Sequence, residues 1–426
     1  MDRPPPWLDP RTAYLHIPFC AHHCGYCDFA VSAGQDHLIE LYLDALDLEL
    51  AALGTPRPVE SIFVGGGTPT YLNPAQLRRL LESIRQWLPL VGGGRSVGWD
   101  KSAQSHHAPQ LLDGGTAPSL VPPYETPAPE FSIESTPDSL TDEKAALLAA
   151  FGVNRVSIGV QSFRPDLLAA LDRRHTAAEI PRAVEAVRRH VPRLSFDLIF
   201  AAPGGTPEAW AADLDAALAY RPDHVSTYGL TYEKGTPLWK RQARGEVTAV
   251  GEEAELAMYE GAIDRLTAAG FEHYEISNFA RPGGRCRHNE RYWANEAYYG
   301  FGVGAARYVG GRRELNTRDT KLYVRNVLAG ESPTFQSECL GPRDRAFETI
   351  GTQLRRADGI DRLRFAEQTG FALDDLVGDR VRHLAGVGIL ADDGRRVSLT
   401  RRGKCVADAV IEDLMKANPT PDPATV

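Results

Sequence analysis

The first half of the chain alternates short apolar runs with stretches in which apolar residues recur every three or four positions. The short runs predict six β-strands, at residues 14–17, 61–64, 131–134, 155–159, 194–200 and 224–228. Between the first two, residues 37–53 have the apolar spacing of a helix. Repeated β–α units of this length predict parallel strands with right-handed crossovers. Six units indicate an α/β fold with an open, partial (β/α)6 barrel.

Residue types at helix ends support this order of elements. Asn73 followed by Pro74 is typical of an N-cap with proline at the first helical position, and it opens a helix that ends near residue 88. Thr176 and Glu179 have the spacing of a capping box. Pro181 follows directly, so we expect it to delay or kink the helix that starts there.

The domain organisation follows from where this repeat is interrupted and where it ends. Residues 91–129 are rich in Gly, Ser and Pro where a short loop belongs, which predicts a disordered insertion. After about residue 235 the repeat gives way to a long helix at 252–269, and two short strands around Asp393-Gly394 resemble a small wing. The predicted divisions are an N-terminal arm (1–11), the barrel (12–235), a barrel-completing segment (236–335), a smaller C-terminal helical, winged-helix-like domain (336–417) and a tail (418–426).

Composition and charge narrow the classes of function. The chain has 426 residues, a net charge of −9 and a pI near 5.8, so nucleic acid is not an expected partner. Six cysteines are too few for a disulfide scaffold in a chain of this length. The N-terminal residues do not have the pattern of a signal peptide, and apolar runs fall short of the roughly 18 residues that a membrane-spanning helix needs. We therefore expect a cytoplasmic protein.

Three cysteines lie close together near the start of the chain. Cys20, Cys24 and Cys27 have the spacing C-x3-C-x2-C. Three thiolates can hold three irons of a [4Fe–4S] cluster and leave the fourth iron open to a substrate or cofactor. Zinc is the main alternative, with His22 or His23 as a fourth ligand, and unrelated cysteines are the other.

Polar and glycine residues recur where the predicted strands end. Gly65, Gly66 and Gly67 follow the second strand, where glycine allows a ligand close to the backbone and its N–H groups can meet a carboxylate; a tight turn is the alternative. Further along are the polar residues Glu134, Gln161, Arg173 and Asp197. Each alone is more often structural, but together they offer partners for an amino group, ribose hydroxyls and a carboxylate. Such a set suits a small zwitterionic nucleoside, bound at the carboxyl ends of barrel strands.

These motifs together resemble the radical S-adenosylmethionine (SAM) superfamily. The resemblance rests on the three-cysteine spacing with Tyr26 before the third cysteine, followed by GGGTPT at 65–70. It covers most of the chain outside the insertion and the first dozen residues. It implies that Cys20, Cys24 and Cys27 hold a [4Fe–4S] cluster, with SAM chelating the fourth iron and being cleaved to methionine and a 5′-deoxyadenosyl radical. By position, the implied SAM contacts are Tyr14, Tyr26, Gly66, Gly67, Thr68, Glu134, Gln161, Arg173 and Asp197.

Further motifs resemble the branch that contains oxygen-independent coproporphyrinogen III dehydrogenase and the HemW-type heme chaperones. The dehydrogenases carry a fourth cysteine where this chain has Phe29, and a longer N-terminal extension than the nineteen residues before Cys20. The chaperones carry H-N-x-x-Y-W, matched here from His288 to Trp293. The resemblance therefore implies heme as a third cofactor, His288 as its ligand and delivery of heme to respiratory proteins.

Several alternatives stay open at this stage. Coproporphyrinogen III dehydrogenation and another radical-SAM reaction are the rival functions, so enzymatic activity is undecided. His288 is alternatively a structural histidine, and Cys286 is a weaker candidate for a second heme ligand. The glycines at 300, 302 and 304 indicate a close-packed loop rather than a dinucleotide site. Ala201-Ala202-Pro203 stands where relatives usually have Gly-Leu-Pro, which predicts a change in local packing. Peripheral membrane contact and the oligomeric state are also left open.

Overall fold

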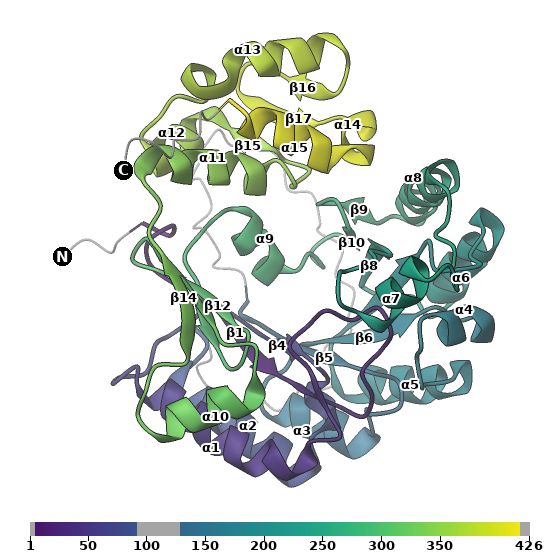
Figure 1. Ribbon diagram of the computed structural model, residues 1–426, viewed down its shortest axis with the longest axis vertical. Helices are drawn as coiled ribbons and strands as arrows, with labels where there is room; N and C mark the ends of the chain where they lie inside the picture. The colour runs from purple at the N-terminus through teal and green to yellow at the C-terminus, as the bar shows by residue number, and fades with distance from the viewer. Residues whose placement is uncertain (1–4, 92–127, 418–426) are drawn as a thin grey trace, which may run out of the picture.

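The computed structural model describes residues 5–91 and 128–417, and a nine-stranded sheet forms its centre (Figure 1). The strand order is β11-β1-β4-β5-β6-β7-β8-β10-β9. Its six middle strands are parallel: β1 (Thr12–Ile17), β4 (Ser61–Gly66), β5 (Glu130–Ser135), β6 (Arg155–Gln161), β7 (Arg193–Phe200) and β8 (His224–Gly229). These are the six predicted strands, each longer by one or two residues, and the two edges of the sheet do not pair with each other. The predicted α/β fold with a partial barrel is confirmed.

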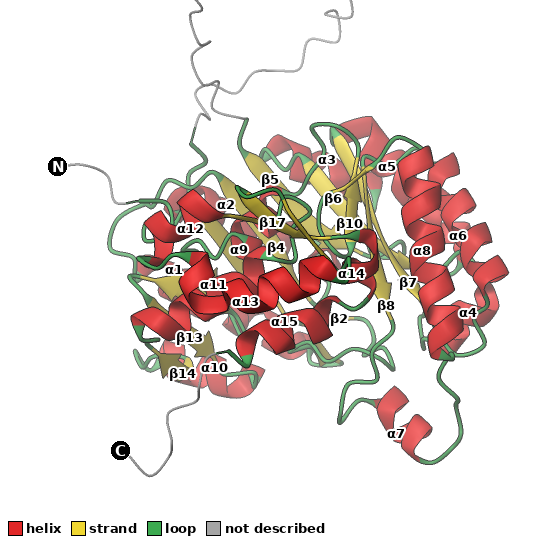
Figure 2. Ribbon diagram, turned by 90° about the horizontal axis from the view of Figure 1, so that it is seen from above, coloured by secondary structure: helices red, strands yellow, loops and turns green. Residues whose placement is uncertain are grey.

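Helices connect these strands and pack on one side of the curved sheet (Figure 2). They are α1 (Ile39–Ala51), α2 (Pro74–Trp87), α3 (Asp142–Ala150), α4 (Pro165–Ala170), α5 (Ile180–His190), α6 (Pro207–Ala219) and α8 (Glu252–Ala268). Asn73 caps α2 in a full capping box with Gln76. Thr176 and Glu179 also form their predicted box, around a single 3₁₀ turn (Ala177–Glu179). Pro181 lies in the first turn of α5, so it delays that helix as expected.

The two faces of the sheet differ in chemistry because side chains alternate along each strand. The face under the helices is apolar: β6 places Val156, Ile158 and Val160 there, all fully buried. The opposite face is lined mainly by polar side chains: Thr12, Ser61, Glu130, Ser132, Glu134, Arg155, Ser157, Ser195, Asp197, His224 and Ser226. Strands buried on both faces usually read as continuous apolar runs, so polar residues on this inner face mark a site rather than a core.

Residues after β8 extend the sheet at both edges. β9 (Glu272–His273) and β10 (Asn278–Ala280) add antiparallel strands beside β8, while β11 (Tyr299–Phe301) pairs in parallel with β1. The remaining elements of this part are α7 (Pro237–Ala243), α9 (Arg287–Trp293), α10 (Thr320–Leu328) and the sheet of β12 (Ala306–Val309), β13 (Arg312–Asn316) and β14 (Thr334–Glu338). Gly302, after β11, has a φ of 95°, and a Cβ there would lie 2.5 Å from the hydroxyl of Tyr42. This fits the close-packed loop that the glycines predict.

The last part of the chain has a hydrophobic core of its own (Figure 1). Phe347, Ile350 and Phe365 are fully buried in it. Its elements are α11 (Pro342–Gln353), α12 (Arg362–Thr369), α13 (Leu373–Gly386), α14 (Arg401–Cys405), α15 (Ala407–Met415), β15 (Ile360–Asp361), β16 (Leu390–Asp392) and β17 (Arg396–Leu399). The hairpin of β16 and β17 turns at Gly394, where the wing is predicted.

Other predictions fall partly outside the described residues. Residues 92–127, which make up nearly all of the expected insertion, are among those not described, as are 1–4 and the tail at 418–426. Within the described ranges, none of the helices combines the length and apolar character needed to span a bilayer.

Candidate functional site: a polar cavity inside the sheet

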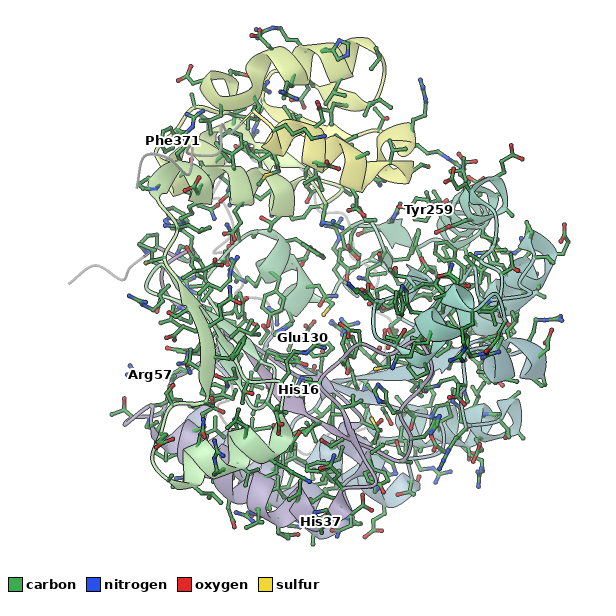
Figure 3. The ribbon with its side chains drawn as sticks, viewed as in Figure 1. His16, His37, Arg57, Glu130, Tyr259 and Phe371 are labelled. Carbon is green, nitrogen blue, oxygen red and sulfur yellow. The ribbon has the colours of Figure 1, made fainter. Side chains whose placement is uncertain are left out.

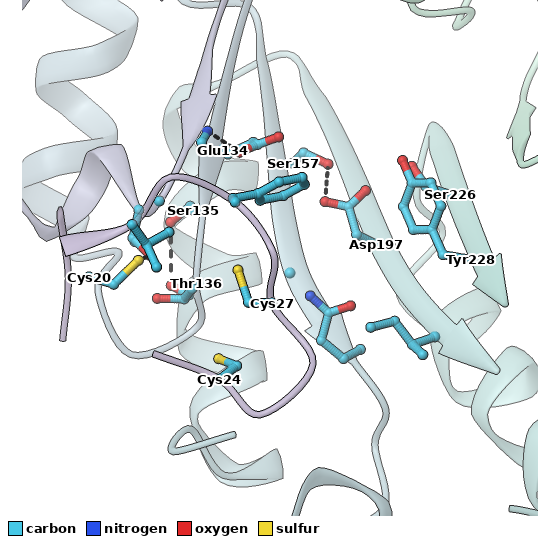
Figure 4. A pocket seen from close by; sticks show the side chains of 18 of the residues that line it. Cys20, Cys24, Cys27, Glu134, Ser135, Thr136, Ser157, Asp197, Ser226 and Tyr228 are labelled. Carbon is cyan, nitrogen blue, oxygen red and sulfur yellow. Dashed lines mark hydrogen bonds between the residues drawn. The ribbon is translucent and has the colours of Figure 1, made fainter. Parts of the chain in front are cut away.

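The polar inner face of the sheet encloses a cavity of about 770 Å³. One end is formed by the loop that follows β2 (Phe19–Cys20) and returns at β3 (Ser32–Ala33); the other reaches α9. Figure 4 shows the three cysteines of this loop facing the strands that carry Glu134 and Asp197. The residues predicted to bind the cluster, SAM and heme all line this cavity: Tyr14, Cys20, Cys24, Tyr26, Cys27, Gly66, Gly67, Thr68, Glu134, Gln161, Arg173, Asp197 and His288.

The cysteine loop is held by contacts to two neighbouring segments. The Sγ atom of Cys20 lies 3.4 Å from Oγ1 of Thr68, and Nη1 of Arg173 donates to Sγ of Cys24 at 3.3 Å. The backbone N–H of Cys27 donates to the carbonyl of Cys24 at 3.1 Å, which closes the turn between them. The three thiols are free. Burial raises the pKa of Cys20 to about 12 and that of Cys27 to about 11, so iron that binds these thiols must displace their protons.

This arrangement fits a [4Fe–4S] cluster. Three free, partly buried thiols can lose their protons to iron, and the guanidinium of Arg173 beside Cys24 compensates negative charge on the thiolates. Among the described residues, no three His, Cys, Asp or Glu side chains are grouped as one metal ion would require. A cubic cluster places each thiolate on a different iron, so its ligands need not converge on one point.

The two histidines considered as zinc ligands have other partners. Nε2 of His22 lies 3.1 Å from the carboxylate of Asp172, and the ring of His23 bonds the carbonyl of Cys27 at 3.0 Å. The first contact ties the cysteine loop to the segment after α4, and the second lies within the loop itself. They give each histidine a structural role that needs no metal.

The glycines at the end of β4 pack against their own chain. A Cβ on Gly66, whose φ is 106°, would lie 2.4 Å from the ring of His16, and one on Gly67 would lie 2.7 Å from the backbone of Pro18. The N–H of Gly66 donates to Oε2 of Glu134 at 2.9 Å, and that of Gly67 donates to the carbonyl of Ile17. In this structure the N–H groups of Gly66 and Gly67 therefore already have acceptors within the protein, in Glu134 and the carbonyl of Ile17.

Two buried carboxyl groups line the cavity, that of Glu134 near the end of β5 and that of Asp197 in the middle of β7. Burial, with the nearby charge of Asp197, raises the pKa of Glu134 to about 8. Burial likewise raises the pKa of Asp197, although Ser157 donates to it at 2.9 Å. With only protein groups around it, Glu134 is therefore mostly protonated at neutral pH. A positively charged or hydrogen-bond-donating ligand would favour its ionised form.

Gln161 and Arg173 sit where the backbone leaves β6. Gln161 has a φ of 63°, in the left-handed region, and its Oε1 atom is buried without a partner. The register between β6 and β7 shifts at this position, so a bulge turns the side chain toward the cavity. Arg173 donates from Nη2 to the carbonyl of Gly159 at 2.8 Å, while its Nε is buried and unpartnered. Strain and unpartnered polar atoms at one place are typical of a ligand site.

The other end of the cavity is formed by His288, in the first turn of α9. Its Nδ1 lies 2.9 Å from Oγ1 of Thr12, and its Nε2 is buried with no partner. The ring stacks on Phe63 at 5.1 Å and lies 4.5 Å from the ring of Tyr292. Burial lowers the pKa of His288 to about 4, so the imidazole is neutral and can use Nε2 to bind a metal.

The neighbouring motif residues differ in their surroundings. Asn289 and Tyr292 line the cavity, whereas Trp293 packs under the guanidinium of Arg355, 5.5 Å away. Cys286 is buried beside Glu130, and burial raises its thiol pKa, which disfavours a thiolate ligand there. Phe29, in place of the dehydrogenases' fourth cysteine, is 65% exposed at the cavity mouth.

Sequence reasoning missed a buried charged pair whose arginine lines the cavity. Glu130 and Arg155 form a buried ion pair at 3.3 Å, next to His288 and His224. Figure 3 shows Glu130 near the middle of the molecule, by α9. A signal was present: in the short strands, Glu130-Phe131-Ser132 and Arg155-Val156-Ser157 alternate polar and apolar residues, which a strand covered on both faces does not need.

Two family models match the chain in separate parts. Residues 14–217 match the radical SAM superfamily, and residues 340–406 match the HemN C-terminal domain. The first range includes the cysteine loop and most of the cavity. The second lies within the part that has its own hydrophobic core.

Curated relatives match over nearly the whole length. The heme chaperone HemW of Bacillus subtilis is 33% identical over 94% of this chain and 98% of its own length, and that of Mycobacterium tuberculosis H37Rv is 34% identical over 95% of each. Among solved structures, coproporphyrinogen III oxidase (HemN) of Escherichia coli superposes with a TM-score of 0.76 at 23% identity, covering 96% of this chain and 90% of that one. The structural likeness shows a shared fold, and the sequence matches are closer. The chain belongs to the HemW family of heme chaperones within the radical SAM superfamily.

Proposed function

We propose that this protein binds a [4Fe–4S] cluster, SAM and heme, and delivers heme to respiratory proteins. The observation that carries the proposal is a single cavity with three free thiols at one end and, at the other, a buried neutral imidazole whose Nε2 has no partner. Family membership makes the cluster and SAM the expected cofactors. Heme is supported by the names of the relatives and by the state of His288.

The cysteine loop would hold the cluster. Cys20, Cys24 and Cys27 would each bind one iron, and the fourth iron would be left to the amino and carboxylate groups of SAM. The cluster, when bound, supplies an electron to SAM; the chain's own part is to place the ligands and exclude water. Thr68 and Arg173 support this placement, since they already contact the sulfur atoms of Cys20 and Cys24.

The strand-end residues would bind SAM. Arg173 has an unpartnered Nε for the carboxylate, and Glu134 offers an acceptor to the amino group. Asp197, between two serines, would accept from the ribose hydroxyls. Gln161 holds an unpartnered carbonyl oxygen in the same cavity, which suits a donor on the adenine ring.

His288 would bind the heme iron through Nε2. The bond from Nδ1 to Thr12 fixes the ring, as second partners of metal-bound histidines commonly do. Phe63 and Tyr292 pack against this imidazole and also line the cavity, so they add aromatic surface beside a flat macrocycle. Heme delivery then requires release of this bond, which a single histidine ligand permits more easily than two.

One preparation distinguishes the chaperone from its enzymatic rival. Protein reconstituted anaerobically with iron and sulfide is titrated with heme, and the same sample is incubated with coproporphyrinogen III, SAM and a reductant. We expect stoichiometric heme binding and no oxidative decarboxylation, because Phe29 replaces a cysteine that the dehydrogenases carry. Robust formation of protoporphyrinogen IX would instead favour the dehydrogenase.

A further inference from the structure

The deep end of the cavity carries a charged residue that none of the proposed cofactor contacts uses. Arg155 lines the cavity and is only 1% exposed. Its three hydrogen bonds all come from Nη2: to the carbonyl of Gly284 at 2.8 Å, to that of Arg285 at 3.0 Å and to Glu130 at 3.3 Å. Its Nε and Nη1 atoms are buried and have no partner. Unpartnered donors on a buried guanidinium are costly, which indicates that a ligand completes them.

Glu130 cannot be that partner, because its own oxygens are already engaged. Besides Arg155 it accepts from the backbone N–H groups of Arg287 and His288, each at 3.3 Å, and from the thiol of Cys286 at 3.5 Å. These bonds hold the N-terminus of α9. Although burial alone would raise it, Arg155 holds the pKa of Glu130 below its ordinary value, so the pair is ionic.

Further positive charge lies beside this pair. Arg193 is the register partner of Arg155 on β7. Burial and the charge of Arg155 both lower the pKa of Arg193, because a second positive charge close by disfavours the protonated form. On the cavity wall nearby, Ser195 and His224 bond each other at 2.8 Å and are uncharged. The deep end therefore suits an anion that accepts hydrogen bonds.

We propose that Arg155 binds a carboxylate of the ligand whose iron His288 holds, namely a propionate side chain of heme. This inference rests on the proposed function. The carboxylate of Glu130 accepts both from Nη2 of Arg155 and from the backbone N–H of His288, so the two residues are close neighbours. Both line the cavity, each with buried, unpartnered nitrogen atoms, so one ligand of the size of heme can meet the two side chains together. Heme carries two flexible carboxylates at its edge, and arginine is well suited to bind them. SAM is the other carboxylate source, but its carboxylate is expected at Arg173.

The first test changes the ligand and leaves the protein intact. Reconstituted wild-type protein is titrated with heme and with heme dimethyl ester, in which both carboxylates are blocked while the iron is unchanged. We expect heme to bind at least tenfold more tightly than the ester. Equal affinities would overturn the inference. If neither compound binds although cluster and SAM load normally, the proposed function falls and this inference with it.

The second test changes the residue. Arg155→Gln should weaken heme binding at least tenfold, leave binding of the ester unchanged and leave SAM binding unchanged. The single variant leaves the carboxylate of Glu130 buried without its charged partner, which can destabilise the protein. The double variant Glu130→Gln/Arg155→Gln removes both charges and is therefore tested as well. Its melting temperature and cluster content show whether it is folded and loaded. Arg155→Lys should restore part of the difference between heme and the ester. If a variant loses affinity for heme and for the ester equally, Arg155 has only a structural role. If it loses affinity for SAM alone, Arg155 binds the carboxylate of SAM instead. Either result overturns the inference.

Discussion

Cys20, Cys24 and Cys27 are expected to be individually indispensable for the cluster, because each supplies the only thiolate to one iron. Replacing any one of them by Ala should reduce iron from close to four per chain to a small fraction of that after anaerobic reconstitution, with loss of the iron–sulfur absorbance. Cys339→Ala is the matched control, since this exposed thiol lies away from the cavity and should leave iron content unchanged. Stoichiometric zinc without iron–sulfur absorbance in the wild type would contradict the assignment.

Arg173 contacts both the cysteine loop and the end of β6, so its loss should affect SAM more than folding. Arg173→Ala should weaken SAM binding by roughly 1.5–3 kcal/mol, the range of a hydrogen bond to a charged group. Arg182→Ala, at an exposed position of α5 that does not line the cavity, should change it by less than about 0.5 kcal/mol. Calorimetric titration of the reconstituted proteins measures both. Equal affinities in the two variants would remove Arg173 from the site.

Glu134 predicts a pH dependence in the SAM-free protein. Its pKa rises from an ordinary value of 4.5 to about 8 on folding, so the folded chain holds an extra proton between these values. The free energy of unfolding contributed by Glu134 is therefore constant below about pH 4.5 and falls as pH rises toward 8. Glu134→Gln, which mimics the protonated form, should flatten this fall and be more stable at pH 8 by an amount on the order of a few kcal/mol. Denaturant titrations at pH 5 and pH 8 measure it, and parallel curves for both proteins would refute it.

At the scale of elements, the turn after β7 shows the effect of one departure from the relatives' pattern. Ala201, where relatives usually have glycine, has a φ of 58°, while the next residue, Ala202, is not among those with positive φ. An L-residue in the left-handed region costs roughly 1–2 kcal/mol, whereas glycine at an ordinary position costs about 0.5–1 kcal/mol. Ala201→Gly should therefore be more stable than Ala202→Gly by about 1 kcal/mol or more in thermal unfolding. The reverse order would show that the lost Ala201 methyl outweighs the relieved strain.

The short helix α9 depends on the sheet for its position. Glu130, the first residue of β5, accepts from the N–H groups of Arg287 and His288, in the first turn of the helix. A carboxylate at this end also interacts favourably with the helix dipole. The strand thereby fixes the backbone of His288, and Thr12 on β1 fixes its ring. Two strands that are far apart from α9 in sequence thus hold the imidazole in place.

For the whole molecule, the strands and the residues at their ends could be predicted from the sequence. The spacing of apolar residues and the helix-capping residues are local signals that identify strands and helices. Parallel strands bring their carboxyl ends to one edge of the sheet, so Glu134, Gln161 and Asp197 were expected to lie together. The deep ion pair of Glu130 and Arg155 could not be placed in the same way. It forms through the register of β5 and β6 and through α9, which is more than a hundred residues away, and no local pattern encodes such a pairing.

The antiparallel edge at β10 and the parallel pairing of β11 with β1 also escaped prediction in detail. Strands of three residues carry too little periodicity to identify, and their pairing depends on the sheet already formed. The roles of Gly66 and Gly67 could be predicted only in part. A run of glycines indicates that another group comes close to the backbone, but it does not identify that group. In this fold the approach is to His16 and Pro18 of the neighbouring strand and loop.

The most direct test of the whole account is the heme spectrum of the cluster-loaded protein with and without His288. Wild-type protein should show a Soret band at one heme per chain, and His288→Ala should lose or markedly shift that band, because removing the axial ligand changes the coordination of the iron. The variant should keep its iron–sulfur absorbance and SAM affinity, since His288 is not among the residues proposed to hold the cluster or SAM. An unchanged heme spectrum in His288→Ala would contradict the account.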